Sequence, residues 1–177
     1  MALSGIGKRY AVALFNASVA EDVLDQVHGD LVSFAKLVSD EPALRVFLGS
    51  HRVSTDEKHD LIVTAIGERA SGLFVKFVLL LINKKRIDEF AKNRFEDIVE
   101  PFEALYQEHN RILKVSIVTA VPMDSELERK TKDAIERRTG KTAIIEKHID
   151  PKKVSIAIVG TKKDIEKQLG EVKVIPP

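Results

Sequence analysis

The most apolar stretch of the chain is a ten-residue run from Leu73 to Ile82, in which Lys76 is the only polar residue. Ser71 precedes this run, and a serine hydroxyl there can accept a hydrogen bond from the backbone at the start of a helix. A helix that is apolar on nearly every side belongs in the centre of a helical domain. Ten helical residues span about 15 Å, half of the ~30 Å that a bilayer requires. The pattern therefore predicts a core helix around which the first half of the chain folds.

Apolar residues recur at intervals of three and four on both sides of this run, which is the spacing of one face of a helix. The pattern predicts four helices before the run and one after it, so we expect residues 1–110 to form a six-helix bundle. Pro101 lies inside the last segment and predicts a kink or break there, because proline has no backbone N–H. The apolar stripes comprise Leu3, Ile6, Tyr10, Ala13, Leu14 and Ala17; Val27, Leu31, Phe34 and Val38; Leu44, Phe47 and Leu48; Leu61, Ile62, Ala65 and Ile66; and Ile87, Phe90, Ala91, Ile98, Phe102 and Leu105.

Polar residues mark the ends of several predicted helices. Ser54 and Glu57 have the spacing of a capping box in front of the fourth helix, and Gly67 is expected to close that helix. Asp40 is expected to cap the short third helix, which carries Pro42 in its first turn.

The pattern changes after position 110. Residues 112–121 alternate apolar with polar side chains and are rich in β-branched residues, which predicts a strand. Asp124 or Ser125 is expected to start a helix that Gly140 closes in the left-handed conformation. Residues 142–149 and 154–159 predict two further strands on either side of an Asp150-Pro151 turn, and residues 161–169 and 172–175 predict a short helix and an edge strand. This part is therefore expected to be a small α+β domain.

The composition changes at the same place. Residues 1–110 contain 13 basic and 17 acidic residues, a net charge of −4, whereas residues 111–177 contain 15 and 10, a net charge of +5. Every aromatic residue lies at or before Tyr106. We therefore expect two domains in an α+β chain, with residues 1–110 as the helical bundle and residues 111–177 as the small α+β domain.

Few residues suggest chemistry. The chain has no cysteine, which excludes disulfides and thiolate catalysis, and its histidines are scattered, so we expect no metal site. The stretch Ser4-Gly5-Ile6-Gly7-Lys8 lacks the first glycine of a phosphate-binding loop and follows no strand. No Gly-x-Ser-x-Gly elbow occurs. We therefore expect no catalytic residue and no cofactor and, because no apolar leader follows Met1, a cytoplasmic protein.

Two other classes of function remain open at this level. The basic residues 111–177 would suit a nucleic-acid-binding module, but this half lacks the aromatic side chains on which bases stack. A small enzyme is the second alternative, which a deep pocket with two or more titratable groups of displaced pKa would indicate.

An ordered set of residues runs through most of the chain. It comprises Arg9-Tyr10-Ala11 and Ala13-Leu14, then Pro42, Phe47-Leu48 and Lys58, then Phe77, Leu80, Leu81, Asn83 and Arg86, then Ile98, Phe102 and Leu105, and finally Asp150-Pro151. This set resembles the delta subunit of bacterial ATP synthase, the counterpart of the mitochondrial oligomycin-sensitivity-conferring protein. The chain differs from that family after Val154, where Ser155-Ile156 replaces two glycines.

The resemblance implies a non-catalytic connector in the stator of the synthase. In that family the helical domain binds N-terminal segments of the alpha subunits at the top of the catalytic head. The C-terminal domain holds the end of the peripheral stalk, which the b subunits form. Such a connector resists the torque of the rotor, so that rotation drives ATP synthesis. The resemblance also implies a location on the inner face of the cell membrane, through the complex only, and no nucleic-acid partner.

The first helix and the central apolar helix are the expected binding surface for the N-terminal helix of the alpha subunit. Small side chains on one helix opposite an apolar helix would form a groove for an amphipathic partner helix. The candidate residues are Tyr10, Ala13, Leu14 and Ala17 on the first helix and Phe77, Leu80 and Leu81 on the central helix. Packing within the domain is the alternative for each of them.

Overall fold

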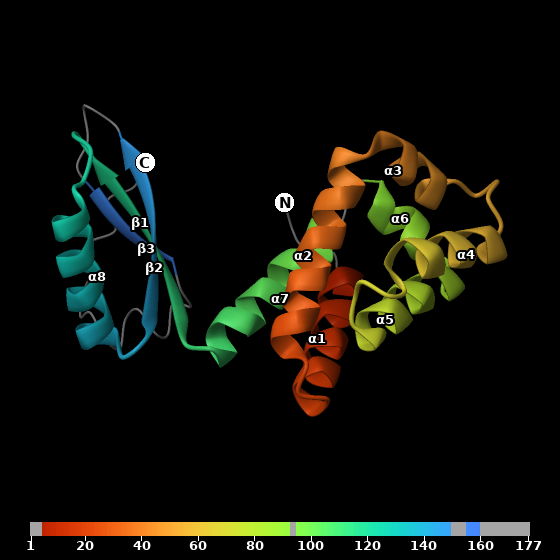
Figure 1. The fold of residues 1–177 in the computed structure, drawn as a ribbon, viewed down its shortest axis with the longest axis horizontal. Coiled ribbons are helices and arrows are strands. Elements are labelled where there is room, and N and C mark those ends of the chain that lie inside the picture. The colour runs from red at the N-terminus through yellow and green to blue at the C-terminus, as the bar shows by residue number, and fades with distance from the viewer. Residues whose placement is uncertain (1–4, 93–94, 150–154, 160–177) are drawn as a thin grey trace. The chain divides into compact units, whose positions relative to one another are not determined.

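Seven helices occupy the described residues between Gly5 and His109 (Figure 1). The computed structural model describes residues 5–92, 95–149 and 155–159. The chain divides into two units, Met1–Tyr106 and Gln107–Pro177, of which the first is helical. Its helices are α1 (Gly5–Ala20), α2 (Leu24–Asp40), α3 (Pro42–Gly49), α4 (Thr55–Ile66), α5 (Gly72–Asn83), α6 (Ile87–Ala91) and α7 (Glu96–His109).

The apolar run forms α5 and lies in the core of the helical unit, as predicted. The Ser71 hydroxyl accepts a hydrogen bond from the Phe74 N–H (3.3 Å), which confirms the predicted cap. The Ser71 N–H donates to the Asp30 carboxylate of α2 (2.8 Å) and so joins the start of α5 to a second helix. The side chains of α5 that are at most 6% exposed are Phe74, Phe77, Val78, Leu81 and Ile82.

Aromatic side chains connect α5 to its neighbours. Phe34 of α2 meets Phe74 and Phe95 edge to face, with ring centroids 5.7 and 5.4 Å apart. Edge-to-face pairs add stabilisation beyond the area that they bury, because the positive edge of one ring meets the negative face of the other. All four residues of the apolar stripe predicted on α2 are at most 4% exposed, namely Val27, Leu31, Phe34 and Val38.

The last predicted helix of the bundle is two helices, so the expected count of six is wrong. The chain breaks between α6 and α7, after Ala91, and not at Pro101, where a break was predicted. Pro101 is an interior residue of α7, and its ring removes only one helical hydrogen bond, to the Asp97 carbonyl four residues earlier. One lost bond does not end a helix whose Ile98 and Phe102 are fully buried.

The predicted caps of α4 are confirmed, whereas the predicted cap of α3 is wrong. Ser54 and Glu57 form the expected capping box, and Gly67 follows the last residue of α4. Asp40, however, is the last residue of α2, and Glu41 occupies the position before α3 without a capping hydrogen bond from its side chain.

The second unit is built on a three-stranded sheet with strand order β2-β1-β3. Its described elements are β1 (Ile112–Thr119), α8 (Ser125–Thr139), β2 (Thr142–Ile149) and β3 (Ser155–Val159). Strand β1 pairs parallel with β2 and antiparallel with β3, and α8 is the crossover between the two parallel strands. Leu113, Val115, Ile117 and Ala143 form its buried cluster, against which Met123, Ile135 and Ile145 pack.

The predicted elements of this unit agree closely with the structure. Asp124 caps α8 by accepting a hydrogen bond from the Leu127 N–H (2.7 Å). Gly140 closes α8 with φ +65°, a conformation that favours glycine. The Asp150-Pro151 turn, the short helix at residues 161–169 and the edge strand at residues 172–175 lie outside the described residues.

Helix α7 is tied to α2 just before the division between the units. The Tyr106 hydroxyl donates to the Asp25 carboxylate (2.8 Å), and the His28 ring stacks on Tyr106 with centroids 3.9 Å apart. His28 also bonds the Glu103 carboxylate through Nε2. These contacts anchor the C-terminal half of α7 to the helical unit.

Helices α1 and α7 come so close at Gly7 that a side chain does not fit. A Cβ at Gly7 would lie 2.5 Å from the Asp97 carbonyl oxygen, which belongs to a helix backbone and cannot swing away. We predict that Gly7→Ala lowers the free energy of unfolding by about 1–3 kcal/mol, measured by urea denaturation. The control is Gly29→Ala in α2, where a Cβ meets nothing within 4 Å and alanine should be neutral or stabilising by up to ~1 kcal/mol. Equal transition midpoints for both variants would show that the two helices do not meet in this way.

The capping box lowers the pKa of Glu57, because the Ser54 hydroxyl and the Ser54 N–H both donate to its carboxylate (2.7 and 2.8 Å). Because the pKa of Glu57 is lower in the folded state than in the unfolded state, the ionised carboxylate stabilises the fold at pH values above the unfolded-state pKa. This stabilisation is lost as the pH falls through the folded-state pKa. We predict that Ser54→Ala raises the pKa of Glu57 towards its usual value. An NMR titration of the Glu57 carboxylate measures this, and an unchanged pKa in the variant would rule out the capping contact.

Candidate partner-binding surface

Helices α1 and α5 meet through Tyr10 and Phe77, whose rings lie edge to face with centroids 6.3 Å apart. Tyr10 also contacts Phe90 of α6 (5.9 Å), so its ring packs against the core although the residue as a whole is half-buried. On each helix, apolar residues at the spacing i, i+4 and i+7 lie on the same side as the Tyr10–Phe77 contact. They are Ile6, Tyr10, Ala13 and Ala17 on α1 and Leu73, Phe77 and Leu80 on α5, and we call them the α1/α5 face.

Part of the α1/α5 face is open to solvent. Leu80 is 43% exposed, although it belongs to the most apolar helix of the chain. Ala13 is exposed, and Ile6, Ala17 and Leu73 are half-buried. The face therefore combines apolar chemistry with accessibility, as a surface that binds an apolar partner does.

The structure divides the predicted binding residues into two groups. Leu14, Phe77 and Leu81 are at most 6% exposed and pack in the core of the helical unit. Tyr10, Ala13, Ala17 and Leu80 reach the surface. Only the second group offers surface to a partner of this chain, while the first group supports it from beneath.

Ile6 and Leu73 complete the face but were absent from the predicted set of binding residues. The sequence signal was present, since each lies four residues before an aromatic residue of the face, Tyr10 or Phe77. A stripe of apolar residues does not by itself separate positions that face a partner from positions that face the protein's own core.

The most buried cluster of titratable groups among the described residues joins α4 to α6. The Lys58 ammonium bonds one oxygen of the Asp88 carboxylate, and both residues are buried. His51 Nδ1 lies 2.8 Å from the other carboxylate oxygen, with its ring largely in solvent. The Lys58 ammonium offsets the charge of Asp88, and His51 contacts its second oxygen, which explains how a carboxylate can be 7% exposed.

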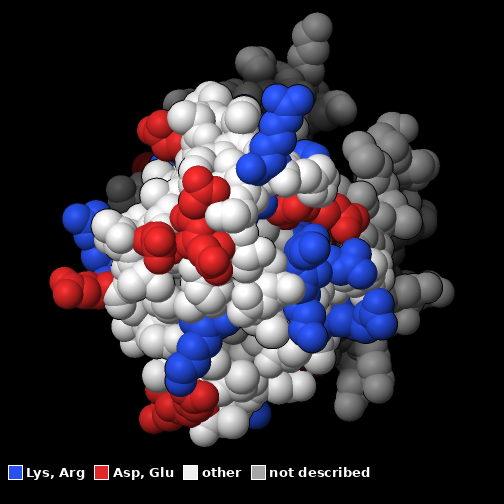
Figure 2. All heavy atoms as spheres, turned by 90° about the vertical axis from the view of Figure 1, so that its right-hand side faces the viewer, with Lys and Arg blue, Asp and Glu red and all other residues white. Residues whose placement is uncertain are grey.

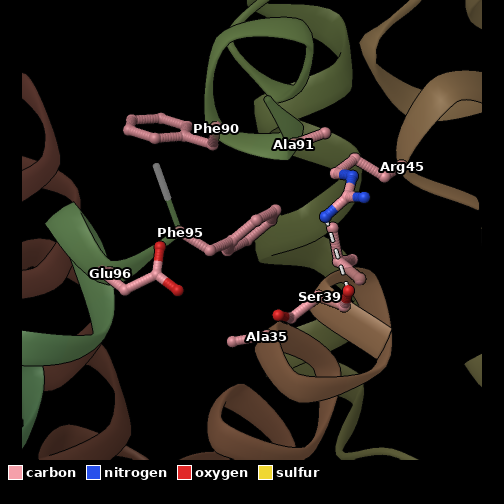
Figure 3. Close-up of a pocket in the computed structure, with 8 residues that line it drawn as sticks. Ala35, Ser39, Arg45, Phe90, Ala91, Phe95 and Glu96 are labelled. Carbon is pink, nitrogen blue, oxygen red and sulfur yellow. Dashed lines mark hydrogen bonds between the residues drawn. The ribbon is translucent and has the colours of Figure 1, made fainter. Parts of the chain in front are cut away.

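Two hollows of the described surface share Arg45. One, of about 20 Å³, is lined by Phe90 and Phe95 and has room for about one water molecule. Figure 3 shows Arg45 reaching from α3 towards the end of α2, where its Nη1 donates to the Ser39 carbonyl (3.4 Å). The other is an open depression of about 440 Å³ beside Val46 and Lys92. Neither hollow is lined by Lys58, Asp88 or His51, so the buried ion cluster opens on neither.

Within the part of the chain that the structure describes, no group of three or more histidine and acidic side chains is placed to hold a metal ion. In the same residues, no helix combines the length and the apolar character that crossing a membrane requires.

Residues 6–158 match the family described as "ATP synthase delta (OSCP) subunit". The ATP synthase subunit delta of Syntrophus aciditrophicus is 30% identical over 139 residues, which cover 78% of this chain and 74% of that protein. The subunit of the same name from Parabacteroides distasonis is 30% identical over 156 residues, which cover 85% and 81%.

Among solved structures, a chain of the Toxoplasma gondii mitochondrial ATP synthase hexamer has a similar fold, with a TM-score of 0.65 and 23% identity. The superposition covers 97% of this chain and 89% of that one.

The buried ion cluster predicts a large loss of stability when its carboxylate is removed. Asp88→Ala leaves the Lys58 ammonium buried without its partner, which should lower the free energy of unfolding by about 3–5 kcal/mol in urea denaturation. The double variant Lys58→Met/Asp88→Leu removes both charges and should regain most of this loss. The control is Glu89→Ala in the exposed Arg86–Glu89 pair, for which about 1 kcal/mol or less is expected. If Asp88→Ala costs no more than Glu89→Ala, the cluster does not stabilise the fold.

Proposed function

Because the chain belongs to the family of ATP synthase delta (OSCP) subunits, we propose that it is a non-catalytic connector in the stator of the synthase. In this function residues 1–110 bind the N-terminal helix of an alpha subunit at the top of the catalytic head. Residues 111–177 hold the C-terminal helix of the b subunits, which form the peripheral stalk. The chain is then peripheral to the inner face of the cell membrane, through the complex only.

The observation that carries the proposal is the exposed, apolar α1/α5 face. Leu80 exposes 43% of its surface, and covering it with a partner would remove apolar area from water. Ala13 and Ala17 lie one turn apart on α1, and their small side chains let a partner helix approach closely. An amphipathic helix with apolar side chains at i, i+3, i+4 and i+7 fits such a surface.

The second unit offers exposed apolar residues as candidate contacts with the stalk. Ile144 and Ile149 of β2 are 45% and 59% exposed, and Leu127 of α8 is 51% exposed. Strand β2 is at one edge of the described sheet, where a partner can reach it.

A connector transmits load from one unit to the other through the chain that joins them. Helix α7 continues to His109, beyond the end of the first unit at Tyr106, and β1 begins at Ile112. The contacts of Tyr106 with Asp25 and His28 fasten α7 where it leaves the helical unit.

Neither the matching family nor the related proteins named above support nucleic-acid binding by the basic second half of the chain. The connector is therefore the function that we propose.

A charge placed on the α1/α5 face should prevent binding to the head. We predict that Ala13→Arg weakens the affinity for an N-terminal peptide of the same organism's alpha subunit by about tenfold or more, because a guanidinium would be buried without a partner. Calorimetric titration of the full chain measures this, and the unchanged protein should bind one peptide with micromolar or tighter affinity.

The fold of Ala13→Arg should be intact, because Ala13 is exposed, and circular dichroism checks this. The matched control is Val46→Arg on α3, which introduces the same charge at a side chain that is 70% exposed and outside the face. Unchanged affinity in Ala13→Arg, or equal weakening in Val46→Arg, would refute binding at this face.

A further inference from the structure

Helices α1 and α5 contain no acidic residue, although they belong to the acidic half of the chain. Helix α1 carries Lys8 and Arg9, α5 carries Lys76, and Lys84 and Lys85 follow α5 directly. Residues 1–110 nevertheless have a net charge of −4. The acidic residues of this half therefore lie on other segments. On the side of the helical unit that Figure 2 shows, several basic side chains form one group, while other basic and acidic side chains are scattered around it.

Three of these cations border the α1/α5 face. Arg9 lies one helical turn before Ala13, and Lys76 and Lys84 lie one turn before and one turn after Leu80. The Lys84 N–H donates to the Leu80 carbonyl (2.9 Å), so the helical spacing continues to Lys84. All three residues are exposed. Cations therefore stand beside the two most exposed positions of the face.

Within the described part of the chain, no carboxylate pairs with Arg9, Lys76 or Lys84. Other cations of the same unit do have partners, such as Lys58 with Asp88 and Arg86 with Glu89. The border of the face thus presents positive charge that the described residues do not neutralise.

We propose that the α1/α5 face binds an acidic amphipathic helix, whose carboxylates flank its apolar stripe and meet Arg9, Lys76 and Lys84. This inference rests on the proposed function and specifies the chemistry of the partner helix. The apolar stripe supplies most of the affinity, whereas the cations set the orientation of the helix and speed its association. The apolar residues of the face follow helical spacing on two neighbouring helices, which suits a partner helix that lies along them.

The test uses calorimetric titration of the full chain at low salt with two peptides. The first is the N-terminal peptide of the alpha subunit from the same organism, and the second is the same peptide with each Asp and Glu changed to Asn and Gln. Arg9→Glu, Lys76→Glu and Lys84→Glu should each weaken binding of the first peptide by about two- to fivefold. The same variants should leave the affinity for the second peptide unchanged, and added salt should reduce the difference between the peptides.

The matched control is Lys8→Glu, which alters the net charge equally on the same helix. Lys8 lies about 160° around α1 from Tyr10, on the side opposite the face. It should weaken binding of the first peptide less than Arg9→Glu does. Equal effects of the two variants would overturn the proposal, since net charge alone would then explain them.

Two further outcomes separate this inference from the function on which it rests. If the first peptide binds, and Leu80→Arg abolishes binding while the three charge reversals do not weaken it, the acidic partner is wrong and the connector stands. If the first peptide does not bind the unchanged protein, both fail. Binding of phosphatidylglycerol vesicles through the same three cations, with equal affinity for both peptides, would assign the charges to a lipid surface and overturn the proposal.

Discussion

The helical unit depends on the burial of α5. This helix has one charged residue, Lys76, and places Phe74, Phe77, Val78, Leu81 and Ile82 in the core. Each large apolar side chain of this kind contributes about 1.5–3 kcal/mol to folding when it leaves water. The burial of α5 therefore supplies much of the free energy that holds the other helices around it. Phe34 of α2 and Tyr10 of α1 reach it through edge-to-face contacts. Leu80 is the most exposed apolar side chain of α5, at 43%, and in the proposed function a partner would complete its burial.

Polar contacts join pairs of helices at the periphery of the same unit. Lys58 and Asp88 join α4 to α6, and Tyr106 and Asp25 join α7 to α2. Gly7 lets α1 lie directly against the backbone of α7 at Asp97. These contacts surround the apolar core without entering the α1/α5 face. The proposed connector function requires such contacts, because the helices that present the binding surface must keep their positions under load.

The helical and strand periodicities predicted most of the fold, because an element that is buried on one side carries apolar residues at a regular spacing in the sequence. The stripe from Val27 to Val38, the start of β1 and the limits of α8 and β2 followed from such patterns, whereas β1 ends at Thr119, two residues before its predicted end. Predictions from the local sequence failed where tertiary packing determines the structure. Pro101 was expected to break a helix, but Ile98 and Phe102 bury the turn around it, and the chain breaks instead after Ala91. For the same reason, the sequence pattern did not separate surface from core among the candidate binding residues. Leu14 and Ala13 are neighbours on one apolar helix, and only the packing shows that the first is core and the second is surface.

The proposed function requires that one chain bind the head and the stalk at the same time. Sedimentation velocity of the purified catalytic head, the soluble part of the b subunits and the full chain tests this directly. The connector function predicts that the head and the b subunits sediment together only when the chain is present, in a complex that contains all three. If the head and the b subunits sediment together equally well without the chain, or if the chain binds either one but never both, then it does not connect them.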